Sequence, residues 1–155
     1  MIRSYSLATS EVDDLETAIR EIREQVGAVS LHTHSVGIVT CHYDFINNGI
    51  IQAMGAALPF PIVGITSFYQ VTPQVRGLFE LSITVLTSDD VRFAVAGSDR
   101  EANAGKAPDK IVQDTYQSAY VLHGESPSLL LSFLSANRPM VTARPCSLKP
   151  SSRPK

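Results

Sequence analysis

Hydrophobic residues follow two different periods along this chain, and the order of these periods predicts the fold. In residues 12–26, apolar side chains recur at steps of three and four, at Val12, Leu15, Ile19, Ile22 and Val26. This spacing predicts an amphipathic helix that begins after Ser10 and ends at Gly27, because glycine favours a helix C-terminus. Before it, residues 2–7 alternate weakly between apolar and polar side chains, which predicts an edge strand.

A strand–helix–strand unit is predicted next. Residues 36–41 and 61–66 are short, apolar and rich in β-branched side chains, as is typical of parallel strands covered on both faces. Between them, residues 50–58 carry apolar side chains at helical spacing, and Pro59 ends that helix. Two parallel strands joined by a helix form a βαβ unit, which we expect at the centre of the sheet.

The second half of the chain predicts a hairpin, a helix and one more strand. Residues 79–85 and 91–95 alternate between apolar and polar side chains, and a turn-forming sequence at 88–90 joins them. A further amphipathic helix is expected over residues 108–120, with proline at its first position. The apolar run at 128–135 is expected to form another buried strand.

These elements predict a single α/β domain over residues 1–138. Its sheet is expected to be mixed, with a parallel βαβ core extended by an antiparallel hairpin and helices packed on the sheet. A chain of 155 residues is long enough for one domain with a sizeable core. Residues 139–155 are rich in proline and basic side chains and have no periodicity, so we expect a disordered tail there.

Composition narrows the class of protein. Hydrophobic residues make up 44% of the chain and charged residues 18%, as in ordinary soluble domains. A net charge of -2 and a pI near 6.0 argue against binding to nucleic acid, which needs a basic face. No apolar run approaches the roughly 20 residues that span a bilayer, and the N-terminus has no secretory signal. Cys41 and Cys146 form no disulfide framework, so we expect a cytoplasmic protein.

Polar loops follow both strands of the predicted βαβ unit. In open α/β sheets, ligands bind at the carboxyl edge of the sheet, where such loops meet. We therefore predict a site for a small polar ligand between the loop around residues 42–48 and the loop around residues 66–76. The candidate ligand-binding residues are His42, Tyr43, Asp44, Asn47, Thr66, Ser67 and Arg76.

The same region resembles a known family. The run VGIVTCHYDF leads from an apolar strand into a Tyr-Asp loop, and the stretches PIVGITS and SDDVRF follow it. Together these motifs, within residues 10–137, are similar to the N-terminal half of the FIST domain, a sensory module of signalling proteins. The resemblance implies a cytoplasmic domain, without established catalytic activity, that binds an amino acid or a related metabolite. It also implies that the signal passes through a partner domain or protein.

The chain departs from that family in two ways. Residues 68–71 have the sequence FYQV, where family members carry small residues with glycine and glutamate. The sequence also ends before the C-terminal half of a FIST module. The expected partners are therefore a small-molecule ligand and either a second copy of the chain or a protein that supplies the missing half. Neither nucleic acid nor a membrane is an expected partner.

Two other functions are compatible with the sequence. A small cysteine-dependent enzyme would use Cys41 as its nucleophile, with a histidine from elsewhere, because the adjacent His42 points to the opposite face of a strand. Alternatively, the chain is a truncated remnant without binding activity, and such a remnant would expose an apolar edge.

No cofactor or metal ion is expected. His32 and His34 precede the strand at 36–41, whereas His42 follows it, so a whole strand separates the imidazoles and they do not converge on one ion. The acidic pair at 89–90 lies at the expected hairpin tip, where solvated carboxylates form turns rather than acid–base pairs.

Overall fold

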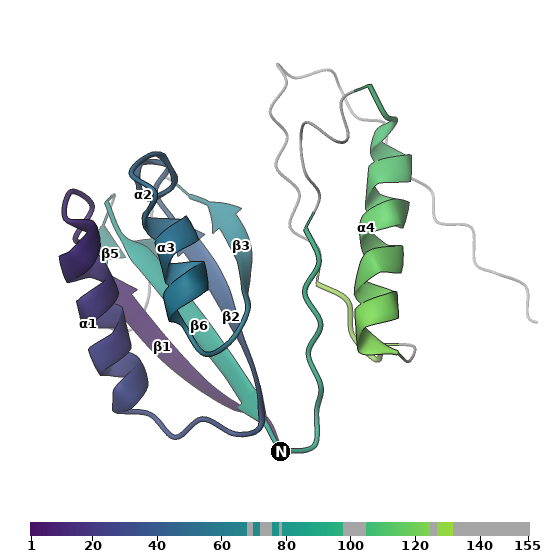
Figure 1. Ribbon diagram of the computed structural model, residues 1–155, viewed down its shortest axis with the longest axis horizontal. Helices are drawn as coiled ribbons and strands as arrows, with labels where there is room; N and C mark the ends of the chain where they lie inside the picture. The colour runs from purple at the N-terminus through teal and green to yellow at the C-terminus, as the bar shows by residue number, and fades with distance from the viewer. Residues whose placement is uncertain (68–69, 72–75, 78, 98–104, 125–126, 132–155) are drawn as a thin grey trace, which may run out of the picture.

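The computed structural model of the protein is built on a four-stranded mixed sheet with helices packed against it (Figure 1). It describes residues 1–67, 70–71, 76–77, 79–97, 105–124 and 127–131. The predicted α/β class and the mixed sheet are confirmed. The tail predicted at 139–155 lies outside the described residues.

The sheet has the strand order β1-β6-β2-β3. Its members are β1 (Arg3–Thr9), β2 (His34–Cys41), β3 (Ile62–Thr66) and β6 (Leu81–Ser88). β2 and β3 are parallel, as the βαβ pattern predicts, and both other pairs are antiparallel. The expectation that the βαβ unit lies at the centre of the sheet is wrong for β3, which is an outer strand. β2 is therefore the strand that joins the parallel and antiparallel parts of the sheet.

The antiparallel extension is not the hairpin that the alternation at 91–95 predicts. Residues 91–97 form no strand, and the outer partner of β6 is the N-terminal strand β1, with Arg3 opposite Thr87. The Ser88 hydroxyl accepts hydrogen bonds from the backbone N–H groups of Asp90 and Val91, at 3.1 Å each. A side-chain oxygen that satisfies these donors takes the place of a strand ladder, so the chain leaves the sheet after Ser88.

Helix α1 (Leu15–Gly27) begins later than the hydrophobic spacing predicts. Its N-cap is Asp14 rather than Ser10, and Asp14 Oδ1 accepts from the backbone N–H groups of Glu16 and Thr17 at 3.0 and 3.1 Å. Asp14 can satisfy two of the free N–H groups of the first turn at once. The predicted end at Gly27 is confirmed.

Two helices lie between β2 and β3, where the sequence predicts one. The short helix α2 (Asp44–Asn47) follows β2 directly, and α3 (Ile50–Ala57) follows α2. Gly49 separates the two helices with a φ of 75°, a left-handed conformation that glycine adopts without a steric cost. The loop predicted after β2 is therefore mostly helical.

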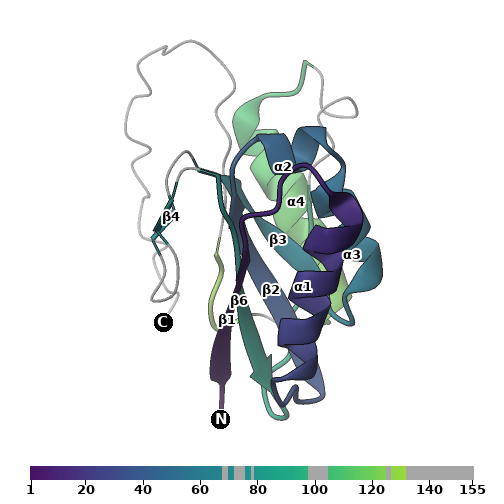
Figure 2. The same cartoon turned by 90° about the vertical axis from the view of Figure 1, so that its left-hand side faces the viewer.

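The core lies between one face of the sheet and helices α1–α3. Figure 2 shows these helices on one side of the sheet, whereas the small ribbon strand β4 (Gln70–Val71) lies on the other side. The fully buried side chains Leu81, Ile83 and Val85 alternate along β6 and face this helix layer. Ala18 and Ile22 of α1, with Met54 of α3, complete the central contacts.

Helix α4 (Pro108–His123) stands apart from this core. It starts at Pro108 as predicted, but no residue of α4 is buried, and Figure 1 places it beyond the β3 side of the sheet. Residues 128–131 are exposed and form no strand, contrary to the predicted buried strand, whose remainder at 132–135 lies outside the described residues. None of the described helices is long and apolar enough to cross a membrane.

At Gly64 the backbone of β3 approaches the backbone of β2 closely. A Cβ atom at this position would overlap the carbonyl group of Val39 on β2. β3 can therefore pair with β2 in its observed register only if residue 64 has no side chain.

We expect Gly64→Ala to lower the free energy of unfolding by about 3 kcal/mol, because the added methyl group forces β3 away from β2. Urea denaturation followed by circular dichroism measures this change. Gly27→Ala is the matched control, since a Cβ at Gly27 meets no atom within 4 Å. Equal midpoints for the two variants would contradict the close approach.

Asp89 links the chain after β6 to the loop before β2 through hydrogen bonds. Asp89 Oδ1 accepts from the Thr33 backbone N–H at 3.0 Å and from its hydroxyl at 2.9 Å, and Asp89 Oδ2 lies 2.7 Å from His32 Nδ1. The hydrogen bonds from Thr33, and then the one with His32, lower the pKa of Asp89 to about 2. The expected turn role of Asp89 is thus carried out through contacts with a distant loop.

The pH dependence of stability reports on this contact. Because the folded-state pKa of Asp89 lies below its ordinary value of 3.8, its stabilisation is present above about pH 4 and is lost as the pH falls toward 2. We expect Asp89→Asn to melt at a lower temperature than the wild type at pH 6, with the difference shrinking at pH 2.5. A constant difference across this range would show that the carboxylate charge has no role.

Candidate functional site

The two polar loops predicted to form a site do emerge side by side. Cys41 at the end of β2 lies opposite Thr66 at the end of β3, and the Ser67 backbone N–H donates to the Cys41 carbonyl at 2.8 Å. Helix α2 lies at the same end of the sheet as the tip of β3 (Figure 1). The loops after the two strands thus meet at one edge, as the topology rule for α/β sheets requires.

His42 is the centre of the polar groups at this edge. Its Nδ1 lies 3.2 Å from Asp44 Oδ2 and 3.4 Å from the Asp44 backbone nitrogen. Its ring also packs on Phe79, with ring centroids 4.6 Å apart and the planes tilted by 59°. With a side chain only 16% exposed, His42 is held by contacts on several sides. This arrangement favours a fixed imidazole rather than a freely rotating surface group.

Glu80 belongs to the same edge, although the sequence pattern does not single it out. The His42 backbone N–H donates to the Glu80 carbonyl oxygen at 3.2 Å, so the two residues are neighbours across the ends of β2 and β6. The Glu80 Oε2 atom is buried and accepts no hydrogen bond from the described residues. Burial raises the pKa of this carboxyl group.

The remaining predicted residues are less closely gathered. Tyr43 and Asn47 are exposed. Arg76 lies in the two-residue strand β5 (Arg76–Gly77), which pairs with β4 so that Arg76 is opposite Val71. The placement of the Arg76 side chain lies outside the described part of the structure. The structure thus brings together His42, Asp44, Thr66 and Ser67, and adds Glu80.

An apolar hollow of about 290 Å³ lies along the helix side of β3. Its lining consists of residues 62–66 with Val39, Cys41, Ile46 and Ile51. Thr66 is the one predicted site residue that lines it. Because Thr66 pairs with Cys41, whereas His42 is the next residue along the chain, successive side chains divide between this hollow and the polar groups. The edge therefore has an apolar side and a polar side.

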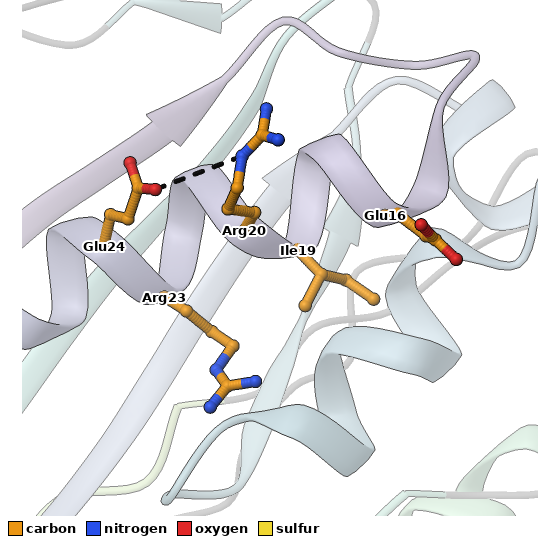
Figure 3. Close-up of a pocket in the computed structure, with 5 residues that line it drawn as sticks. All are labelled: Glu16, Ile19, Arg20, Arg23 and Glu24. Atoms are coloured by element: carbon orange, nitrogen blue, oxygen red, sulfur yellow. Dashed lines mark ion pairs between the residues drawn. The ribbon is translucent and has the colours of Figure 1, made fainter.

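A larger depression, of about 470 Å³, lies on the outer surface of α1 (Figure 3). It is lined by Glu16, Ile19, Arg20, Arg23 and Glu24. Arg20 Nε and Glu24 Oε1 are 4.0 Å apart, and both side chains are largely exposed. Solvated charges along one turn of a helix are typical of its wet face. This depression lies away from the strand ends and carries no buried polar group.

Comparisons with known proteins found no relative of the chain. No family model matches it, and no curated protein matches it. Within the described residues, no three His, Cys, Asp or Glu side chains are grouped so that they could hold a metal ion.

Cys41 is buried in the core, with 3% of its surface exposed. Burial raises the pKa of its thiol to about 11. A nucleophilic cysteine needs a thiolate, and a thiolate needs an adjacent base or positive charge to stabilise it. Here the surroundings stabilise the neutral thiol, so Cys41 packs as a small apolar side chain.

We expect Cys41 to resist alkylation in the folded protein. In a Cys146→Ser variant, iodoacetamide at pH 7.5 should modify Cys41 at least about tenfold more slowly in buffer than in urea, because the folded state holds the thiol neutral and buried. Mass spectrometry of quenched samples measures both rates. Rapid modification of the folded variant would instead favour a cysteine-dependent enzyme.

Proposed function

We propose that this protein is a ligand-sensing module that binds a small, amine-bearing metabolite such as an amino acid. The binding region lies between the chain after β2, at His42–Asn47, and the chain after β3, from Thr66 to Arg76. The observation that carries the proposal is the parallel pairing of β2 and β3. At the end of this pairing, the Ser67 backbone N–H donates a hydrogen bond to the Cys41 carbonyl. The resemblance to the N-terminal half of a FIST domain suggests the same ligand class.

The chemistry of the edge favours a ligand with a donor group. Glu80 Oε2 is a buried acceptor without a partner among the described residues, and such an atom is costly unless something donates to it. An ammonium group would supply that donor and would favour the charged carboxylate, reversing the effect of burial on the Glu80 pKa. Asp44 adds a second negative group near His42.

The opposite end of an amino acid needs groups that bind a carboxylate. Ser67 and Thr66 carry hydroxyl groups that can donate hydrogen bonds. Arg76, at the end of the same segment, has a guanidinium group whose geometry matches a carboxylate. A ligand with an ammonium and a carboxylate group would thus find chemical groups at this edge that complement both.

A sensor must pass its signal onward. We assign this step to a partner domain or protein in the cytoplasm, as in the family that the sequence resembles. Ligand binding would shift the population of conformations at the β2–β3 edge, and a partner that contacts this edge would detect the change.

A thermal-shift screen with the twenty amino acids at about 5 mM tests the proposal, since a ligand that binds only the folded state raises the melting temperature by mass action. We expect at least one amino acid to raise it. Glu80→Gln should abolish most of this rise, because the variant loses the negative partner of the ammonium group. Glu24→Gln, an exposed position on α1, should leave the rise unchanged.

The proposal fails in either of two outcomes. In the first, no amino acid changes the melting temperature of the wild-type chain. In the second, a shift occurs but is equal in the wild type, Glu80→Gln and Glu24→Gln, which would place binding away from the β2–β3 edge.

A further inference from the structure

The two outer edges of the sheet are treated differently. β1 forms one edge, and the side chain of Gln25 covers part of it: Gln25 Nε2 donates to the Ala8 carbonyl at 2.8 Å, and Gln25 Oε1 accepts from the Ala8 backbone N–H at 2.9 Å. β3 forms the other edge, and within the described residues it pairs with β2 alone. Part of the β1 edge is thus covered by α1, whereas no described residue covers the β3 edge in this way.

In the part of the chain that the structure describes, the β3 edge also lacks the features by which proteins protect an edge strand. Natural edges usually carry charged side chains, an internal proline, a bulge or a covering element. β3 has the sequence IVGIT, with no charge and no proline, and Ile65 is 38% exposed. Gly64 and Thr66 are exposed as well. A short uncharged strand of this kind is suited to pairing with another strand.

We propose that a second copy of the chain pairs with β3, edge to edge and antiparallel, so that two sheets join into one. The two-fold axis passes through Gly64, which places Val63 opposite Ile65 of the second copy. Ile62 then lies opposite Thr66 of the second copy. Cross-strand pairs of β-branched side chains stabilise antiparallel sheets, and β3 supplies such a pair on each face.

A second copy fits this edge for reasons of symmetry and charge. An antiparallel pair of identical strands is isologous, so a single contact pairs the β3 edges of both copies at once. The uncharged sequence brings no like charges together. A contact limited to five-residue strands and the side chains beside them is small, so we expect a weak dimer that depends on concentration.

The apolar surface of α4 is the main rival for self-association. Val121 and Leu122 are both 70% exposed, and no residue of α4 is buried. This surface has no defined complementary groove, whereas β3 offers a row of backbone groups in fixed register. The two surfaces can be separated by placing one lysine on each.

Sedimentation velocity of the full chain, over a range of protein concentrations, tests the proposal. We expect the wild type to shift from monomer to dimer as concentration rises. Ile65→Lys should remain a monomer, because the two lysines would lie close together on the same face of the joined strands. Val121→Lys, the matched substitution on α4, should dimerise like the wild type. Circular dichroism confirms that each variant is folded.

Disulfide trapping tests the register independently of the lysine variants. In a Cys146→Ser background, the double variant Val63→Cys/Ile65→Cys should form covalent dimers on mild oxidation. The new thiol at position 63 lies opposite the new thiol at position 65 of the second copy. Each single variant should cross-link far less, since it lacks the opposite thiol.

The proposal is overturned if the wild type stays monomeric at every concentration tested. It is equally overturned if Ile65→Lys dimerises normally, or if the single and double cysteine variants cross-link alike. None of these measurements involves a ligand, so they leave the proposed sensing function untouched.

Discussion

The structure depends on the backbone pairing of β2 with two different neighbours. β2 pairs with β3 in parallel and with β6 antiparallel, so Cys41 lies opposite both Thr66 and Leu81. This double pairing fixes which chain segments meet at the carboxyl end of β2. It brings the residues after β3 and the residue before β6 to the same edge. Without it, His42, Ser67 and Glu80 would belong to unrelated parts of the surface.

The elements that sequence reasoning finds correctly are those whose pattern is local. The apolar stripe of α1 fits the helical period, and the runs of β2 and β3 are short, apolar and rich in β-branched residues, so each pattern favours one type of element. The partner of β6 is different, because both β1 and residues 91–95 alternate in the same way. Side chains decide between them: the Ser88 hydroxyl and the Asp89 carboxylate bind backbone N–H groups, and the chain turns away from the sheet. Contacts with a loop more than fifty residues distant are absent from any local pattern.

The candidate site likewise combines residues that the sequence predicts with one residue, Glu80, that it does not. A general rule for α/β sheets predicts that the loops after β2 and β3 meet. The hydrogen bond between the Ser67 N–H and the Cys41 carbonyl is the contact where they do. Glu80 could not be found in this way, because alternation with Phe79 and Leu81 assigns it to a wet face. Its carboxyl oxygen is buried by groups that the fold brings to it, and only the three-dimensional arrangement reveals an acceptor without a described donor. In the structure, Glu80 is the residue that faces His42 across the ends of β2 and β6.

The proposed ligand site and the proposed dimer contact share Thr66 but otherwise use different groups of β3. Ligand binding would involve side chains at and beyond the end of the strand, whereas dimer formation would use the outward backbone groups of residues 62–66. The close approach of Gly64 to Val39 and the hydrogen bond from the Ser67 N–H to the Cys41 carbonyl hold β3 against β2. A strand held this firmly on one side presents its other edge in a fixed geometry. Rigidity imposed by β2 is therefore what would make both the loop site and the open edge specific.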